Sequence, residues 1–139
     1  MYKIEYVDED KRVLKYKDKE LEFTKDVELA SKFQELPKRT KTRMIVDLAK
    51  QGISINSLVI KTQKDGKTIE DHSNEDAIYK MYQGEEMSKI LDEICTKYFN
   101  MTLVKLLEDM ELTKEQEFKF GGDLMEALIG KQESPKKSQ

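Results

Sequence analysis

Apolar residues recur at intervals of three and four over much of the second half of this 139-residue chain, and this spacing constrains the fold most. Such spacing places side chains on one face of an α-helix, because the helix turns once every 3.6 residues. One stripe covers about three turns and ends near Asn100, which we expect to break or kink the helix. A shorter stripe follows it. The two stripes consist of Met87, Ile90, Leu91, Ile94, Cys95 and Tyr98, and then of Leu103, Leu106, Leu107 and Met110.

The residues after Met110 predict one further helix with a defined start. Thr113 and Gln116 form a capping-box pattern, in which each side chain satisfies a backbone N–H that the first helical turn leaves unbonded. This helix must tolerate Gly121 and Gly122, each of which costs about 1 kcal/mol relative to alanine. The two glycines therefore indicate a kink or a close approach by another helix.

Two regions in the first half of the chain favour β-strands. Tyr2, Ile4 and Tyr6 occupy alternate positions, and the acidic turn at residues 8–10 separates them from further strand-like residues. Later in the chain, Asp65-Gly66 lies between two β-favouring runs, which is the pattern of a two-residue hairpin turn. We therefore expect a small antiparallel β portion.

Helical patterns fill the positions between these β regions. Thr24 is the expected N-cap of the first helix, and Pro37 its expected end, because proline disfavours helical geometry in the residue before it. The remaining expected helix ends are Thr40 and Gly52 for a second helix, and Asn74 and Gly84 for a third.

Together these patterns predict an α+β fold that is mostly helical, with an antiparallel β portion from residues 2–23 and 57–71 packed against about five helices. One domain over residues 1–130 is the simplest arrangement for this length. Residues 131–139 contain no apolar side chain, so we expect a disordered polar tail. The expected core is Phe33, Leu36, Ile45, Leu48, Ile90, Ile94, Leu103, Leu106 and Leu124.

Composition limits the class of protein. Charged residues make up 38% of the chain, against about 25% in an average domain, and the net charge is −3. This small net charge does not by itself indicate nucleic acid or membrane as a partner. No apolar run reaches the length of a membrane span, and Met1–Glu5 lacks the apolar core of a signal peptide. We therefore expect a cytoplasmic protein with no membrane partner.

The residue types that carry chemistry are few. Cys95 is the only cysteine and lies on an apolar stripe, so a buried core position is the preferred interpretation. His72 is the only histidine and falls at the end of a hairpin arm, where we expect it to be solvated. The chain has no phosphate-binding glycine loop, no nucleophile elbow and no metal-binding histidine pair. We expect no catalysis, no cofactor and no metal ion, although a deep cleft containing His72 or Cys95 would revive an enzymatic hypothesis.

One basic segment leaves a second functional hypothesis open. Residues 38–50 have no interleaved aromatic side chains for base stacking, so a solvated helix face or a surface for an acidic protein is the preferred interpretation. A small nucleic-acid-binding or regulatory protein is the alternative. The segment carries five basic side chains against one acidic one, a local net charge of +4, and these are Lys38, Arg39, Lys41, Arg43 and Lys50 against Asp47.

The last third of the chain resembles the tail assembly chaperones of long-tailed bacteriophages, especially those of Gram-positive hosts and their prophages. The resemblance rests on the acidic run Thr113–Glu117, the run from Gly122 to Leu128, and Gly130-Lys131 near the end. It covers about thirty residues with specificity, together with the small size, the acidic character and the short N-terminal β segment. The β-rich region before residue 75 is larger than the family pattern implies.

The resemblance implies a role in virus tail assembly. A protein of this family coats the tape measure protein, keeps that long helical chain soluble, and gives way to tail tube subunits. Family members self-associate, and they are commonly made in two lengths by a ribosomal frameshift, for which Gly130-Lys131 and Lys136-Lys137 are the candidate sites here. We expect self-association through helix faces. The expected protein-binding residues are Leu103, Leu106, Leu107, Met110, Phe118, Leu124, Met125 and Leu128.

Overall fold

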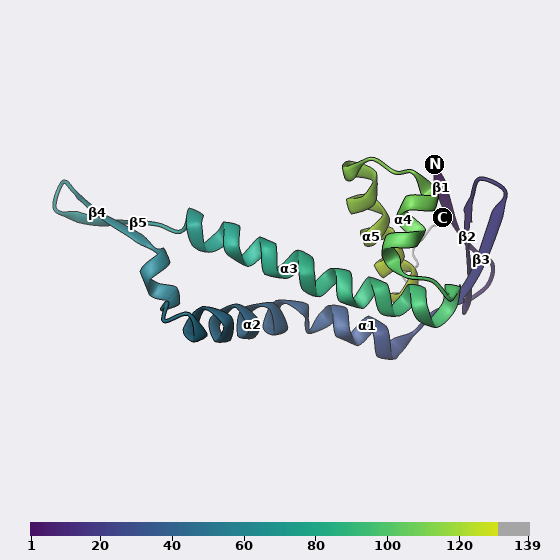
Figure 1. The fold of residues 1–139 in the computed structure, drawn as a ribbon, viewed down its shortest axis with the longest axis horizontal. Helices are drawn as coiled ribbons and strands as arrows, with labels where there is room; N and C mark the ends of the chain where they lie inside the picture. Colours follow the sequence, from purple (N-terminus) through teal and green to yellow (C-terminus); the bar gives the residue numbers. More distant parts are fainter. Residues whose placement is uncertain (131–139) are drawn as a thin grey trace, which may run out of the picture. The chain divides into compact units, whose positions relative to one another are not determined.

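The computed structural model describes residues 1–130 (Figure 1), and these residues form two compact units. Unit 1 contains residues 1–34 and the described residues from Ser88 to Gly130, and unit 2 contains residues 35–87. The described residues are 60% helical, with five α-helices and small antiparallel sheets, which confirms the predicted α+β class. The expected polar tail at residues 131–139, with Lys136-Lys137, lies outside the described residues.

The division into two units differs from the single domain predicted over residues 1–130. The chain leaves unit 1 after residue 34 and returns to it at residue 88. Periodicity shows which side chains face a core, but it does not show that two stretches far apart in sequence share one core. The intervening segment has an apolar cluster of its own.

Unit 1 begins with an antiparallel sheet of three strands, β1 (Tyr2–Tyr6), β2 (Lys11–Tyr16) and β3 (Lys19–Thr24). The strand order is β1-β2-β3, so β2 lies in the middle and is the most buried strand. The predicted acidic turn precedes it: the carboxylate of Asp8 accepts hydrogen bonds from the backbone N–H groups of Asp10 (2.9 Å) and Lys11 (2.7 Å).

The helices of unit 1 cover this sheet and supply most of the core. The core side chains include Leu14 and Phe23 from the sheet and Ile94, Leu106 and Leu124 from the helices, all at most 1% exposed. The helices are α1 (Val27–Gln34), the end of α3 (Ser73–Ile94), the π-helical turn η2 (Cys95–Phe99), α4 (Leu103–Met110) and α5 (Lys114–Ile129).

Arg12 connects the central strand to the end of α5. Its side chain is buried, and Nε donates to the carbonyl oxygen of Ala127 at 3.1 Å. Nη1 donates to the carbonyl oxygens of Asp8 and Glu9 at 2.9 and 3.0 Å, and the guanidinium lies over the ring of Tyr6. Backbone carbonyls, including one at a helix C-terminus, therefore stabilise this buried positive charge.

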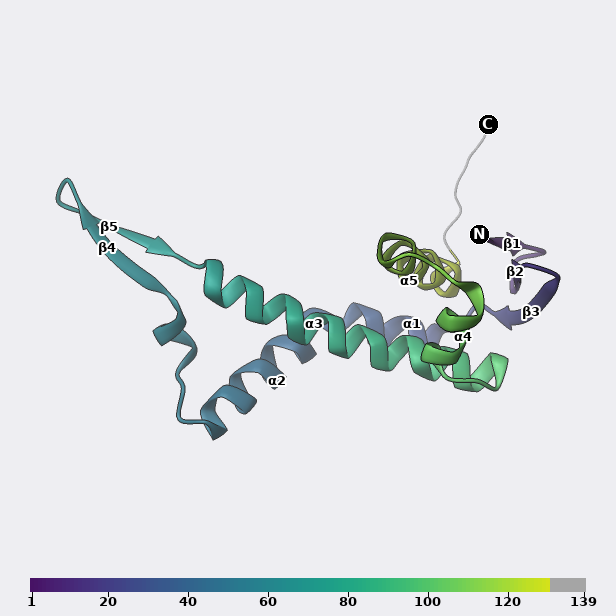
Figure 2. The same ribbon diagram turned by 45° about the horizontal axis from the view of Figure 1, so that its top comes forward.

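Unit 2 contains α2 (Leu36–Lys50), the 3-10 turn η1 (Ile55–Leu58), the strands β4 (Ile60–Lys64) and β5 (Lys67–Asp71), and the first part of α3. Met44 and Leu48 of α2 pack with Tyr82 of α3 in its apolar cluster. Figure 2 shows the β4–β5 hairpin extending beyond the start of α3. The predicted hairpin is confirmed, and both turn residues adopt positive φ, 54° at Asp65 and 73° at Gly66. This is the geometry of the type I′ turn that Asp-Gly favours.

Several predicted element ends are confirmed and others are wrong. The capping box of Thr113 and Gln116 is present, and Asn100 follows η2 in the left-handed conformation. Asp26, rather than Thr24, accepts the N–H of Leu29 at the start of α1. Pro37 lies in the first turn of α2, where its missing N–H costs nothing, so it begins a helix instead of ending one. Thr40 lies inside α2 and Gly84 inside α3, because packing in unit 2 outweighs the local preferences of these residues.

The predicted core residues are all buried except Ile45, which is 41% exposed. Ile45 follows Met44 on α2, and Met44 is the residue that packs against α3 within unit 2. Since neighbouring helical residues point about 100° apart, only the stripe through Met44 and Leu48 reaches the cluster.

Candidate protein-binding surfaces

The structure divides the eight expected protein-binding residues between the core and the surface. Five of them have side chains at most 8% exposed and belong to the core of unit 1, so they offer no surface to a partner. Leu107 and Met125 are half-buried, and Phe118 is 83% exposed. The five buried residues are Leu103, Leu106, Met110, Leu124 and Leu128.

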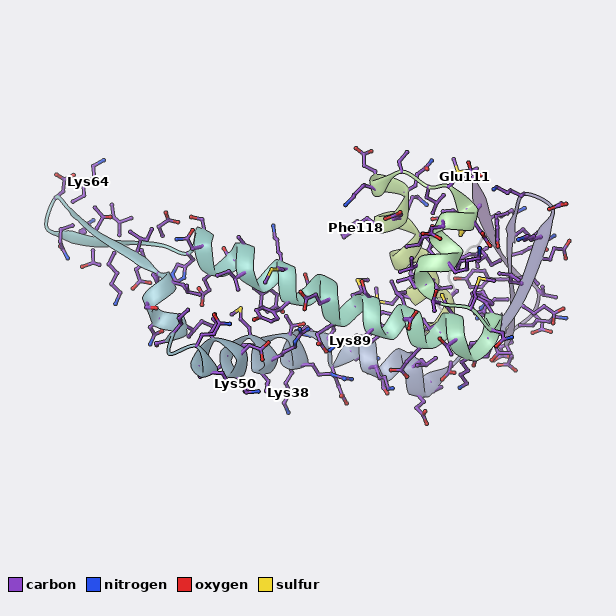
Figure 3. The ribbon with its side chains drawn as sticks, viewed as in Figure 1. Lys38, Lys50, Lys64, Lys89, Glu111 and Phe118 are labelled. Carbon is purple, nitrogen blue, oxygen red and sulfur yellow. The ribbon has the colours of Figure 1, made fainter. Side chains whose placement is uncertain are left out.

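Phe118 lies on the outward side of α5, as Figure 3 shows. Phe120, two positions later, is 1% exposed and packs edge-to-face on Tyr2, with ring centroids 5.1 Å apart. Residues two apart on a helix point to nearly opposite sides, so the same side-chain type serves the core at Phe120 and faces solvent at Phe118.

Phe118 begins an apolar stripe along the outer side of α5. Gly122, Met125 and Ile129 follow it at spacings of four, seven and eleven residues, which places all four on one face of the helix. Ile129 is 47% exposed, and a Cβ built on Gly122 meets no atom within 4 Å. The stripe therefore has a gap at Gly122 between two larger apolar side chains. We call Phe118, Gly122, Met125 and Ile129 the α5 stripe.

Acidic residues flank the α5 stripe on one side. Glu115 and Glu126 lie next to it, and Asp123 lies further round the helix, where it accepts hydrogen bonds from Tyr2 (2.5 Å) and Lys119 (3.0 Å). Burial and the nearby carboxylate of Asp123 raise the pKa of Tyr2, which keeps its hydroxyl protonated as the donor. An apolar stripe with an acidic border suits a helix that carries basic residues beside its own apolar face.

A shallow groove beside α4 gives unit 1 a second apolar feature. Val104 in its lining is 65% exposed, and the side chain of Asp92 accepts the backbone N–H of Leu103 at 2.7 Å. The groove is lined by Ser88, Lys89, Asp92, Thr102, Leu103 and Val104.

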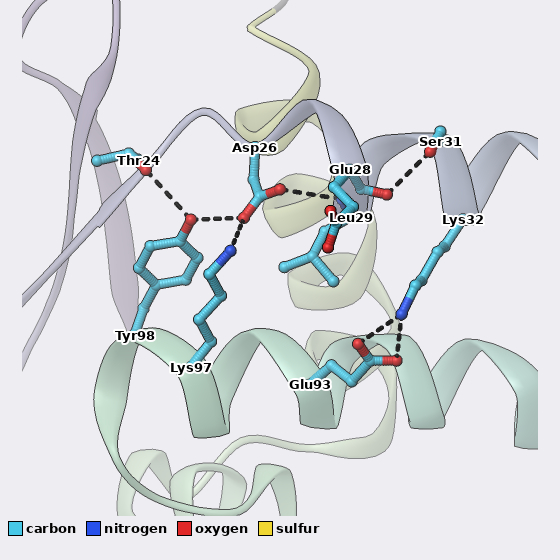
Figure 4. Close-up of polar contacts among 9 residues, drawn as sticks. All are labelled: Thr24, Asp26, Glu28, Leu29, Ser31, Lys32, Glu93, Lys97 and Tyr98. Atoms are coloured by element: carbon cyan, nitrogen blue, oxygen red, sulfur yellow. Dashed lines mark hydrogen bonds and ion pairs between the residues drawn. The ribbon is translucent and has the colours of Figure 1, made fainter.

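A buried polar cluster fixes the start of α1 against η2 (Figure 4). The carboxylate of Asp26 accepts hydrogen bonds from Lys97 Nζ at 2.7 Å, from the Tyr98 hydroxyl at 2.5 Å and from the N–H of Leu29 at 3.0 Å. Burial opposes ionisation of Asp26, but these hydrogen bonds outweigh it and lower its pKa to about 2. These contacts join the start of α1 to the π-helical turn, so we interpret the cluster as structural.

The two residues considered for chemistry occupy ordinary positions. The side chain of His72 is 47% exposed, and its ring nitrogens contact Glu75 (2.8 Å) and Glu70 (3.1 Å), which raise its pKa. Cys95 is buried, and burial raises the pKa of its thiol to about 12, so little reactive thiolate forms near neutral pH. Within residues 1–130, no group of three potential metal-ligating side chains is found. No described helix is long and apolar enough to span a bilayer.

Acidic residues of α3 neutralise part of the basic segment at residues 38–50. Arg43 pairs with Glu85 at 2.6 Å and with Glu86 at 2.9 Å, and it also lies over the ring of Tyr82. Arg39 lies 4.0 Å from Glu86. The two arginines therefore hold unit 2 together, and the lysines carry the remaining positive charge on this face.

We expect this face to bind nucleic acid weakly. In a filter-binding titration with mixed-sequence duplex DNA at about 0.15 M salt, binding should not saturate at protein concentrations of tens of micromolar, on the order of other non-specific binding. The matched variant is K38E/K41E/K50E, which leaves the arginine pairs in place. Tight, steeply salt-dependent binding that this variant abolishes would instead support the nucleic-acid alternative.

No protein-family model, curated protein or solved structure matches the chain. The surfaces themselves are therefore the basis for a functional proposal. Sequence reasoning missed Gly122 and Ile129 of the α5 stripe, although their spacing from Phe118 was available. The buried residues Leu124 and Leu128 belong to a second apolar stripe, on the core side of the same helix. The sequence prediction grouped them with the exposed stripe.

Proposed function

We propose that this chain is a non-catalytic assembly chaperone that binds an amphipathic helix of another protein through the α5 stripe. The observation that supports it is the exposure of Phe118, at 83%, on a helix whose other side completes the core of unit 1. Exposed aromatic side chains on a fixed helix are typical anchors for a partner, because burying a ring releases a large apolar area from water.

The gap at Gly122 supports a helical partner. A helix packs closely where a small residue lets the two backbones approach, and Phe118 and Met125 provide ridges on either side of that position. The acidic flank favours a partner helix with basic residues and keeps the unbound chaperone from aggregating through its apolar stripe.

The resemblance of the C-terminal third to phage tail assembly chaperones indicates the partner. In this proposal the chain binds the tape measure protein in the bacterial cytoplasm, keeps it soluble, and is displaced when tail tube subunits assemble. A tape measure protein is long and helical, so it offers many amphipathic segments of the kind that the α5 stripe fits.

Co-expression with the tape measure protein of the same genome tests this proposal. The wild-type chain should raise the soluble fraction of the tape measure protein several-fold, and Phe118→Ser should remove most of that increase, because the anchor ring is lost. Val27→Ser is the matched control, since Val27 is 77% exposed on α1 of the same unit and lies outside the α5 stripe.

A second variant separates loss of binding from loss of folding. Gly122→Lys fills the gap in the stripe at a position where an added Cβ meets no atom within 4 Å, and it replaces a poor helix former with a good one. It should leave the thermal midpoint unchanged or higher and still abolish solubilisation. Full solubilisation by both Phe118→Ser and Gly122→Lys would contradict the proposal.

A further inference from the structure

The β4–β5 hairpin has no cover within unit 2. Every residue of both strands is exposed, including Ile60 at 50% and Ile69 at 48%, and Figures 1 and 2 show the hairpin standing clear of α2 and α3. An isolated two-stranded hairpin is at best marginally stable in water, because each strand lacks a partner on one side and the sheet lacks a packed face. The two free edges are therefore available for pairing.

The register of the hairpin fixes which backbone groups face outward on β5. The two-residue turn makes Lys64 and Lys67 a hydrogen-bonded pair, and such pairs alternate along an antiparallel ladder. Ile69 and Asp71 consequently bond back to β4. The N–H and C=O groups of Thr68 and Glu70 point to the free edge of β5.

The sequence of β5 is complementary to itself in the antiparallel direction. If Ile69 lies opposite Ile69 of a second copy, the outward groups of Thr68 face those of Glu70 and form hydrogen-bonded pairs on both sides of the centre. The same register places Lys67 opposite Asp71 at both ends. The two copies would thus form a two-fold symmetric strand pair, with the Ile69 side chains at its centre and a pair of opposite charges at each end.

This pairing also relieves a repulsion within the hairpin. Lys64 and Lys67 are directly opposite each other in the register, and like charges at opposite positions destabilise a strand pair. Asp71 of the second copy would lie on the other side of Lys67 and offset that repulsion. Asp71 Oδ1 already accepts the backbone N–H and the hydroxyl of Ser73, which holds the carboxylate beside the strand.

The edge of β4 lacks this complementarity. Antiparallel pairing of β4 with itself would place Thr62 at the centre, Lys64 opposite Ile60 and no acidic residue opposite Lys61. We propose that two copies of this chain associate through their β5 edges into a four-stranded sheet of order β4-β5-β5-β4. The proposal does not depend on the chaperone function, and its surface differs from the helix faces that the sequence predicted.

A pair of proline variants tests which edge is used. Thr68→Pro removes an N–H that faces the free edge of β5, and Gln63→Pro removes the corresponding N–H on β4, so each spares the β4–β5 ladder. A short strand edge gives a weak dimer, with a Kd on the order of 0.1–1 mM for the wild-type chain. In sedimentation equilibrium, Thr68→Pro should weaken association by about tenfold or more, and Gln63→Pro by less than about twofold.

Charge exchange provides the second test. Lys67→Asp and Asp71→Lys each place like charges at both ends of the paired edge, so each variant alone should be monomeric. An equimolar mixture should form the mixed dimer, because the two variants are complementary to each other. Lys64→Asp is the control, since it makes the same change of charge on β4 and should keep the wild-type tendency to associate.

Three results would overturn the proposal: a wild-type chain that stays monomeric at about 2 mM, equal effects of Thr68→Pro and Gln63→Pro, or a mixture of the charge variants without mixed dimers. Far-UV circular dichroism on each variant establishes that α3 is intact, which matters for Asp71→Lys because Asp71 contacts Ser73 at its start.

Discussion

Replacing Phe120 with alanine is expected to lower the free energy of unfolding of unit 1 by about 3–5 kcal/mol, the usual cost of truncating a buried phenylalanine. The ring is 1% exposed and packs on Tyr2 of the first strand. Its loss therefore leaves a cavity between α5 and the sheet. The same substitution at Phe118 should change the free energy of unfolding by no more than about 0.5 kcal/mol, since that ring is exposed.

Urea denaturation followed by far-UV circular dichroism measures both variants. The comparison is well matched because both residues are phenylalanines on the same helix, two positions apart. Phe120→Leu, which keeps most of the buried volume, should recover more than half of the lost stability. Equal midpoints for Phe118→Ala and Phe120→Ala would show that α5 is rotated from the orientation described above.

The decrease of the free energy of unfolding at acid pH should depend on Asp26. The pKa of this carboxyl falls from its ordinary value of 3.8 to about 2 in the folded chain, so folding favours the ionised form. As the pH drops, the unfolded chain takes up this proton first, and the stabilisation is lost between about pH 4 and pH 2. A shift of this size corresponds to about 2 kcal/mol that is fully present above the ordinary pKa.

Asp26→Asn removes this titration while keeping the shape of the side chain. The variant should be less stable than the wild-type chain by about 2–3 kcal/mol above pH 5, and the difference should shrink towards zero near pH 2. Asp10→Asn is the control, because the side chain of Asp10 is 77% exposed. A difference between wild type and Asp26→Asn that stays constant with pH would show that the Lys97 and Tyr98 contacts do not favour the ionised form.

Signals carried by a few adjacent residues could be predicted from the sequence. Asp65-Gly66 specified the hairpin because both residues tolerate the positive φ of its turn, and Thr113 with Gln116 specified the start of α5 because they satisfy backbone groups of its first turn. The α+β class followed from the same local patterns. Such elements need no knowledge of what packs against them.

Features that depend on packing could not be predicted in this way. Gly84 has a weaker helix preference than the residues around it. The helix α3 nevertheless continues past Gly84, because the side chains of Tyr82 and Glu86 on either side are buried. Pro37 suits both the end of one helix and the first turn of the next, and only the structure distinguishes them. Phe118 and Phe120 belong to the same Phe-Lys-Phe sequence, and their separation between surface and core depends on where the sheet lies relative to α5.

The discontinuity of unit 1 has a consequence for the order in which the chain matures on the ribosome. Strands β1 to β3 are translated first, but Tyr98 and Phe99, whose rings pack on Phe23, lie after Ser88. At typical rates of synthesis, about 5–20 residues per second, residues 35–87 delay that cover by roughly 3–10 s. Unit 2 is continuous in sequence and is complete before α5 has been made. The sheet is therefore made before most of the helices that pack on it, and a nonsense codon in the first turn of α5 would remove Phe120, which packs on Tyr2 of β1.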